Sequence, residues 1–309
     1  MGDHNPKRII VMMSSLFVYL AALVFSMLAG SGPINGFFLQ GMRRVSEKYD
    51  TDMTPAAWTF YIWGLIYSWL SCTMVYLLAG LCRRNAYGWM YSHPALLPYG
   101  FYLCWTINYI FNIAWLFLFD RENLVAGVIF SALVASTNYL EMMFSSHGLK
   151  VYGAWLYKHH RLDLWLIWVL VQNGVALYAT WTTLTMLLNL TVVLVHRVGV
   201  SPSDAATLSL ALLLLSALAW FVLENFIFEI HVRYIVSIYP IVIFMLSGII
   251  ARKVNVLAVV DLVLMCILLL VRIVLVVWRH GKHPLYQDAD SSAVTSPMDI
   301  AAAQKVIFT

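Results

Sequence analysis

Three apolar segments of the sequence carry aromatic and amide side chains at helical spacing. Residues at i, i+3, i+7 and i+10 share one face of a helix. The three faces consist of Phe60, Trp63 and Tyr67; of Trp105, Asn108, Asn112 and Trp115; and of Tyr178, Trp181, Thr185 and Asn189.

Amide side chains in such segments must bond to a neighbouring helix or line a cavity, because an unpaired polar group in hydrocarbon is costly. Each residue taken alone fits helix packing, since amides and hydroxyls commonly join helices. A pocket for a flat, largely apolar ligand, however, combines aromatic walls with a few convergent polar groups. The match between three faces therefore favours a small-molecule pocket inside a helix bundle.

Ionisable side chains in the last third of the chain suggest an alternative. Asp261 lies about seven residues inside an apolar segment, and a carboxylate at membrane depth is a candidate for proton coupling. The alternative function is a proton-coupled small-molecule transporter that uses Asp261, although no repeat between the two halves supports it. We expect Glu224, Glu229 and Arg233 at solvated helix ends, and we expect Arg272 to extend toward the membrane surface.

The composition places these segments in a lipid bilayer. Hydrophobic residues make up 62% of the 309 residues and charged residues 11%, whereas soluble domains contain about 45–50% and 25%. The basic residues are scattered, so the net charge of +4 suits anionic headgroups and indicates no nucleic-acid partner. Neither the four cysteines nor the histidines show the spacing of a disulfide framework or a metal site.

Eight apolar segments follow one another along the chain, at about 9–31, 56–81, 96–119, 123–145, 162–195, 205–227, 233–251 and 254–278. The pattern predicts an all-α, polytopic transmembrane bundle of about eight spans, with 162–195 as one long helix. The Lys and Arg counts of the connections favour a topology with both termini cytoplasmic. Residues 279–309, rich in Ser, Ala and Asp, predict a disordered tail.

Three of these segments carry motifs of a known family. The second, TPAAWTFYIWGLIY, resembles the entry helix of the TspO/translocator family, the tryptophan-rich sensory proteins. Its matching positions are Pro55, Trp58, Phe60, Trp63 and Tyr67. The third is similar to the family's L-N-x-x-W signature at Asn112 and Trp115, with Phe111 in place of leucine and Asn108 in place of a usual glutamine.

The fifth segment, LYATWTTLTMLLN, is similar to the family's Y-x-x-W-x-x-x-A-x-x-L-N helix. It matches at Tyr178, Trp181, Leu188 and Asn189, with Thr185 in place of alanine and Leu177 in place of a preceding proline. The resemblance spans residues of about 30–195. It implies a five-helix bundle whose pocket binds a tetrapyrrole (haem or protoporphyrin), a sterol or a synthetic aromatic ligand, and it adds Trp58 to the lining residues.

The domain organisation follows from the resemblance. Residues 1–199 form the expected five-helix unit, and the connection 30–54 is either its lid or a plain solvated loop. Residues 200–278 form three additional helices without a counterpart in the five-helix proteins. These helices either cover a surface that the shorter relatives use for dimerisation or supply a second site. The sequence does not decide whether this chain forms a homodimer.

The expected function is that of a receptor, scavenger or carrier for the apolar ligand. An enzyme is not favoured, because the sequence shows no nucleophile paired with a base, no metal cluster and no phosphate loop. A seven-helix receptor ranks lower still, since D-R-Y and N-P-x-x-Y runs are missing. The sequence leaves the organelle and the identity of the ligand open.

Overall fold

The computed structural model describes residues 4–32, 36–286 and 296–307. Within these residues, seven helices are long and apolar enough to cross a membrane, and an eighth apolar helix is shorter. The prediction of an all-α polytopic bundle is confirmed. The strands found in these residues form one short antiparallel hairpin of β1 (Arg84–Asn85) and β2 (Gly88–Trp89).

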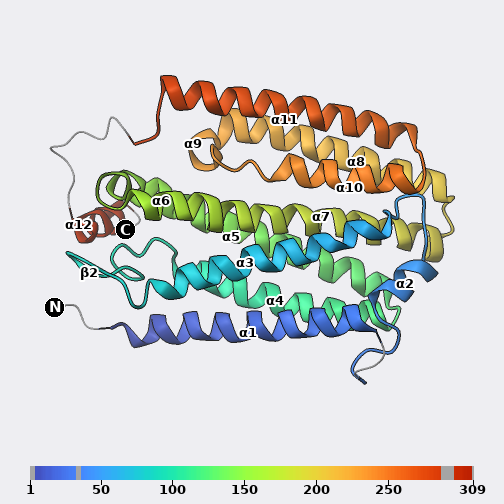
Figure 1. Ribbon diagram of the computed structural model, residues 1–309, viewed down its shortest axis with the longest axis horizontal. Coiled ribbons are helices and arrows are strands. Elements are labelled where there is room, and N and C mark those ends of the chain that lie inside the picture. Colours follow the sequence, from blue (N-terminus) through green and yellow to red (C-terminus); the bar gives the residue numbers. More distant parts are fainter. Residues whose placement is uncertain (1–3, 33–35, 287–295, 308–309) are drawn as a thin grey trace.

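The first five spans form a closed ring of packed helices (Figure 1). Their elements are α1 (Pro6–Ser31), η2 (Ala57–Tyr61) with α3 (Ile62–Ala79), α4 (Tyr99–Asp120), α5 (Leu124–His159), and a fifth helix made of α6 (Arg161–Leu166), η3 (Ile167–Gln172), α7 (Asn173–Val193) and η4 (Leu194–Val198). Around the ring, α1 packs on α4, α4 on α5, α5 on α7, α7 on α3, and α3 on α1.

The fifth span is one continuous helix, as the sequence predicted, although it is locally widened to π geometry at η3. The side chain of Asn173, directly after η3, donates to the carbonyl of Trp168 five residues earlier at 2.8 Å. That bond spans the widened turn. Gly174 lets the helix approach α3 closely, because a Cβ there would lie 2.8 Å from Cδ1 of Trp69.

Three further spans form a layer on the α7 side of the ring, opposite α1 (Figure 1). They comprise α8 (Pro202–Val222) with η5 (Leu223–Ile227), the single turn α9 (Glu229–Val232), α10 (Ile238–Arg252) and α11 (Val256–Lys282). Helix α10 has only 15 residues, about 22 Å of helix. Between η5 and α10 the helix is interrupted, because only the single turn α9 and an irregular segment join them.

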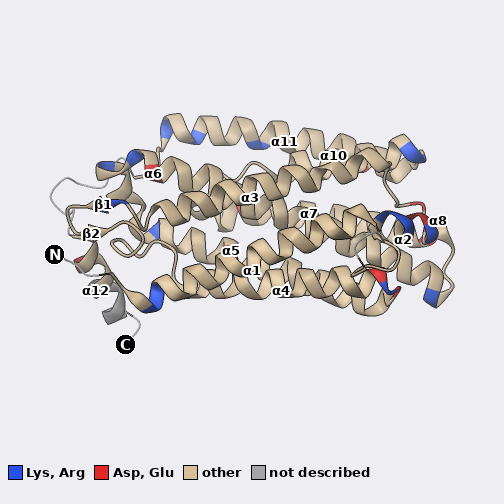
Figure 2. Ribbon diagram, turned by 60° about the horizontal axis from the view of Figure 1, so that its bottom comes forward, with Lys and Arg blue, Asp and Glu red and all other residues tan. Residues whose placement is uncertain are grey.

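Charged side chains gather at the two ends of the bundle, and the middle of the helices is largely free of them (Figure 2). This distribution suits a protein whose central zone lies in hydrocarbon. Capping chemistry sits at the helix starts: Asn5 accepts from the amide of Arg8 before α1, and Asn255 accepts from two amides before α11. The start of α1 and helix α12 (Pro297–Ile307) lie at the same end of the bundle (Figure 1).

The prediction of a disordered tail after Trp278 is wrong for the described part of that segment. Helix α11 continues to Lys282, and α12 packs against α5. The sequence pattern missed α12 because its short apolar stretch is helical through contact with the bundle, with Ile300 partly buried against the core. Residues 287–295 lie outside the described part of the chain.

Candidate functional site

An aromatic cluster joins α3 and α7 inside the five-helix ring. Trp63 stacks on Tyr67 with ring centroids 5.7 Å apart. Its edge contacts reach Tyr178 at 6.3 Å and Trp181 at 6.2 Å. The structure thus brings together four of the residues that the sequence analysis assigned to a pocket.

The cluster continues across the ring through two tyrosines that the sequence analysis missed. Tyr109 of α4 stacks on Tyr178 of α7 with centroids 5.9 Å apart, and Trp105 lies 5.3 Å from Tyr109. Tyr19 of α1 contacts both residues of α4. Tyr109 stands four residues after Trp105, on the same helical face, so its position was readable from the sequence.

Several polar atoms within this aromatic cluster are buried and have no hydrogen-bond partner among the described residues. They are Nε1 of Trp105, the hydroxyl of Tyr109, Oε1 of Glu141, the hydroxyl of Tyr178 and Nε1 of Trp181. Toward the end of the ring that carries the 30–54 connection, Nε1 of Trp115 and Nδ2 of Asn189 share this property. Buried polar groups in proteins are ordinarily paired, so such a concentration marks a place suited to a polar-edged ligand.

Glu141 of α5 is the acidic group of this interior. Its side chain is buried, 2% exposed, and it interacts electrostatically with Tyr109, Tyr178 and Cys104. The sequence analysis did not single it out. An acid inside the apolar segment 123–145 was the available signal, because carboxylates in membrane spans are rare.

The amide side chains of Asn112 and Asn108 have different roles, one within the aromatic cluster and one in helix packing. Asn112 accepts a hydrogen bond of 3.5 Å from the hydroxyl of Tyr67, which also bonds Ser26. Asn108 instead turns to α5, where its Nδ2 donates to the carbonyl of Val134 and to the side chains of Thr137 and Asn138. Asn112 therefore belongs to the aromatic cluster, and Asn108 joins α4 to α5.

Two other predicted lining residues, Trp58 and Phe60, lie away from the cluster. Trp58 is 41% exposed and packs edge-on against Phe244 of α10, and Phe60 is 39% exposed. Both lie within the short 3-10 turn η2, where the α-helical i, i+3, i+7 spacing that relates them to Trp63 and Tyr67 does not hold. Thr185 bonds back to the carbonyl of Trp181 at 2.9 Å. Trp58, Phe60 and Asn108 therefore lie outside the cluster, whereas the lining role of Thr185 stays a prediction.

The described residues of the connection 30–54, namely 30–32 and 36–54, pack over one end of the ring. Its residues Phe38 and Val45 form a small core with Trp115 and Phe119 of α4. The carboxylate of Asp120 accepts three backbone N–H bonds of 2.7–3.0 Å from Leu39, Gln40 and Gly41. Gly41 has φ +82°, and a Cβ there would lie 2.7 Å from Cα of Gly32, so glycine is required at this close approach.

A second carboxylate on the same turn fastens the short helix α2 (Met42–Lys48). Glu122 accepts hydrogen bonds from Lys48, Gln40 and Tyr49. These bonds favour the charged form and lower the pKa of Glu122 to about 2. Glu122 is therefore ionised at neutral pH, and its contacts hold α2 against the turn between α4 and α5.

Asp261 lies on the buried stripe of α11. Its side chain is 0% exposed, and neither carboxylate oxygen has a hydrogen-bond partner among the described residues. Helix α11 packs on α10 and α8, so the carboxyl faces the three-helix layer and not the aromatic cluster. The position matches the expected depth in the span.

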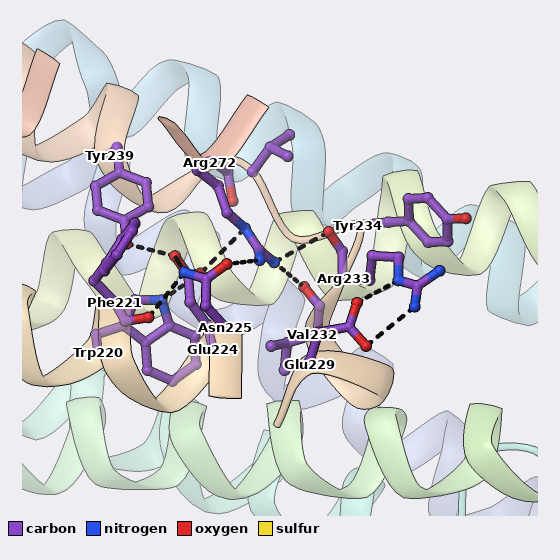
Figure 3. A network of polar contacts seen from close by, with 12 residues as sticks. Trp220, Phe221, Glu224, Asn225, Glu229, Val232, Arg233, Tyr234, Tyr239 and Arg272 are labelled. Carbon is purple, nitrogen blue, oxygen red and sulfur yellow. Dashed lines mark hydrogen bonds and ion pairs between the residues drawn. The ribbon is translucent and has the colours of Figure 1, made fainter. Parts of the chain in front are cut away.

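The other ionisable groups of the three-helix layer form a buried network (Figure 3). The guanidinium of Arg272 lies 3.5 Å from the carboxylate of Glu224, and both side chains are 0% exposed. Arg272 also donates to Oδ1 of Asn225 at 2.9 Å and to the carbonyls of Val232 and Arg233 at 3.0 and 3.1 Å.

This network corrects two expectations. Arg272 does not extend to the membrane surface, and Glu224 is not a solvated end group, because Glu224 also accepts from Tyr239 and from Trp220. Trp220 lies one helical turn before Glu224, whereas Arg272 and Tyr239 come from other helices. Helical spacing within one segment could not reveal these two partners.

Comparison with known proteins places the chain among relatives. Residues 10–278 match the family model described as TSPO-like protein, so the match includes the three C-terminal spans. The Tryptophan-rich protein TspO of Bacillus cereus is 35% identical over 94 residues, which are 30% of this chain and 55% of the relative. The chain thus matches about half the length of that relative, and no solved structure matches it. This multi-pass membrane protein belongs to the TSPO-like family.

Proposed function

We propose that this chain binds a flat, largely apolar small molecule, such as a tetrapyrrole or a sterol, inside the five-helix ring and acts as its receptor, scavenger or carrier. The supporting observation is the group of unpartnered polar atoms within an aromatic cluster. Aromatic faces can stack on a flat ring system, and the indole and phenol groups can bond its polar edges.

The arrangement of the ring suits entry from one end. The described part of the connection 30–54 covers the end where Trp115 and Asn189 lie, and it is attached through Asp120 and Glu122. Because the carboxylates of Asp120 and Glu122 lie where α4 turns into α5, the loop can break its bonds to them while the helices stay folded. We propose that this loop is the lid of the interior site.

Protoporphyrin binding tests the proposal. Titration of the purified protein with protoporphyrin IX should quench tryptophan fluorescence in a saturable manner. Trp115→Ala/Trp181→Ala should weaken the apparent affinity at least about tenfold, since stacking on one aromatic side chain contributes about 1–3 kcal/mol in comparable ring contacts. Trp278→Ala is the control, because Trp278 lies on α11 and is 53% exposed.

Two results would count against the interior site. Quenching that rises linearly with protoporphyrin indicates partitioning into detergent or lipid. Quenching that saturates but weakens equally in Trp278→Ala and in the double variant indicates binding on the surface of the bundle. A sterol titration that displaces protoporphyrin would extend the ligand class.

Asp261 supports a second candidate function, that of a proton-coupled small-molecule transporter. Its buried carboxyl, which has no hydrogen-bond partner in the described part of the chain, is the kind of group that exchanges a proton within a membrane. In proteoliposomes, uptake of protoporphyrin driven by an imposed pH gradient should be lost in Asp261→Asn and retained in Asp299→Asn, a carboxylate outside the spans. Protoporphyrin uptake that is unchanged by the pH gradient and by Asp261→Asn would rule out proton-coupled transport.

A further inference from the structure

A cavity of about 450 Å³ lies between the five-helix ring and the C-terminal layer, away from the aromatic cluster. Its walls come from the end of α5, from α6 and η3, from Tyr234, and from the end of α11 with the residues that follow. Pockets for small ligands commonly have volumes of about 300–1,000 Å³. This space is therefore large enough for a ligand group.

The walls of this cavity are mainly aromatic. Tyr234 lies 4.1 Å from Trp168 between ring centroids, and Trp165 lies 5.2 Å from Trp168. Leu164, Pro284 and Leu285 add aliphatic surface. Such a lining accepts the apolar part of an amphiphile.

Two cationic or potentially cationic side chains line the same cavity. Arg161 donates to the hydroxyl of Tyr157 at 2.6 Å, and its guanidinium lies 4.5 Å from the centre of that ring. Among the described residues, no carboxylate lies within 4.0 Å of Arg161. His280 shares a 2.8 Å hydrogen bond through Nδ1 with the hydroxyl of Tyr234.

The acids near this cavity are already paired with other cations. Asp163 binds Arg83 through two bonds of 2.6 and 2.7 Å. Glu229 binds Arg233 and lies 3.5 Å from Arg279. Within the part of the chain that the structure describes, no acid neutralises Arg161, so its guanidinium can bind an anion and presents several donors that match phosphate oxygens.

The depth of the cavity agrees with this chemistry. Arg161 begins α6, and His280 stands two residues before the end of α11. These helix ends lie at the charged end of the bundle that also carries the start of α1 (Figure 2). Lipid headgroups meet a membrane protein at this level, where Trp and Tyr are also favoured.

We propose that this cavity binds the phosphate ester group of an amphiphile, with Arg161 and His280 on the phosphate and Trp165, Trp168 and Tyr234 around the adjoining apolar part. The phosphate can belong to an anionic phospholipid or to a smaller single-chain phosphate. The site is separate from the interior site, and neither proposal depends on the other.

Native mass spectrometry of the purified full-length chain tests the site with dioleoyl phosphatidic acid, dioleoyl phosphatidylcholine and dodecyl phosphate as probes. Phosphatidic acid should bind more tightly than phosphatidylcholine. Arg161→Gln should weaken it about tenfold, the expected loss of a charge-assisted bond. Arg121→Gln removes an exposed guanidinium at the opposite end of the bundle and should leave binding unchanged.

A second variant tests the space itself. Gly281 lines the cavity, and a Cβ placed there meets no heavy atom within 4 Å. Gly281→Leu should therefore fold normally and reduce phosphatidic acid binding. Dodecyl phosphate binding as tight as that of phosphatidic acid would identify a single-chain phosphate as sufficient, and its weaker binding would identify the membrane lipid. Equal binding of the two phospholipids, or phosphatidic acid binding unchanged in both Arg161→Gln and Gly281→Leu, would overturn the proposal.

Discussion

Replacing Arg272 by methionine is expected to destabilise the protein by about 3–5 kcal/mol, the range for removing one partner of a buried ion pair. The substitution keeps an apolar stem of similar length but leaves the carboxylate of Glu224 without its cation. It also leaves the carbonyls of Val232 and Arg233 without a donor. Thermal unfolding in detergent, followed by tryptophan fluorescence, should show a large fall in the midpoint.

Two comparisons separate this effect from a general loss of charge. Arg252→Gln removes an exposed pair with Asp50, and exposed pairs contribute only about 0–1 kcal/mol. In Arg272→Met/Glu224→Gln no uncompensated charge stays buried, so the double variant should be more stable than the sum of the single losses predicts. A loss for Arg272→Met no greater than that for Arg252→Gln would show that the buried pair is dispensable.

The expected size of the effect follows from the interruption between η5 and α10. Buried backbone groups outside a helix need hydrogen-bond partners from the protein, because leaving them unpaired costs free energy. Arg272 serves two carbonyls of this interruption from one side. From the other side, Asn173 donates to the carbonyl of Tyr234 and accepts from the amides of Val236 and Ser237.

This pairing marks the boundary of what sequence reasoning could predict. Apolar length and helical spacing predicted the spans and placed Trp63, Tyr67, Tyr178 and Trp181 on faces that do converge. Both rest on local periodicity, which one segment contains by itself. The partners of Arg272 lie 39–48 residues away in the chain, and no local pattern encodes which interruption an arginine will serve.

The same distinction explains the errors within the candidate site. Asn108 lies about one helical turn before Asn112, on the same face of α4. Its side chain nevertheless turns to α5, where its Nδ2 contacts three hydrogen-bond acceptors. Trp58 was assigned by family motif, but α10 supplies a neighbour that a five-helix bundle lacks, and the indole packs on Phe244. A residue's direction on a helix is predictable only when the arrangement of all neighbouring helices is known.

Replacing Glu141 by leucine is expected to stabilise the protein and to impair ligand binding at the same time. The Oε1 atom of this buried carboxyl has no partner among the residues that the structure describes. Such a group carries a desolvation penalty of about 1–3 kcal/mol, which leucine removes. Glu141→Gln keeps a polar group of the same shape, so it should give a smaller gain. The thermal midpoint should rise by several degrees in Glu141→Leu.

Measuring ligand binding shows whether the buried carboxyl of Glu141 contacts the ligand. If Glu141 bonds an N–H or O–H group of the ligand, Glu141→Leu should weaken protoporphyrin binding about tenfold or more, and Glu141→Gln should retain part of the affinity. A stabilised Glu141→Leu variant that binds normally would remove the carboxyl from the interior site. A destabilised one would show that Glu141 has a structural partner instead. Stability gained together with affinity lost is the pattern expected of a polar group kept for a ligand at the expense of the fold.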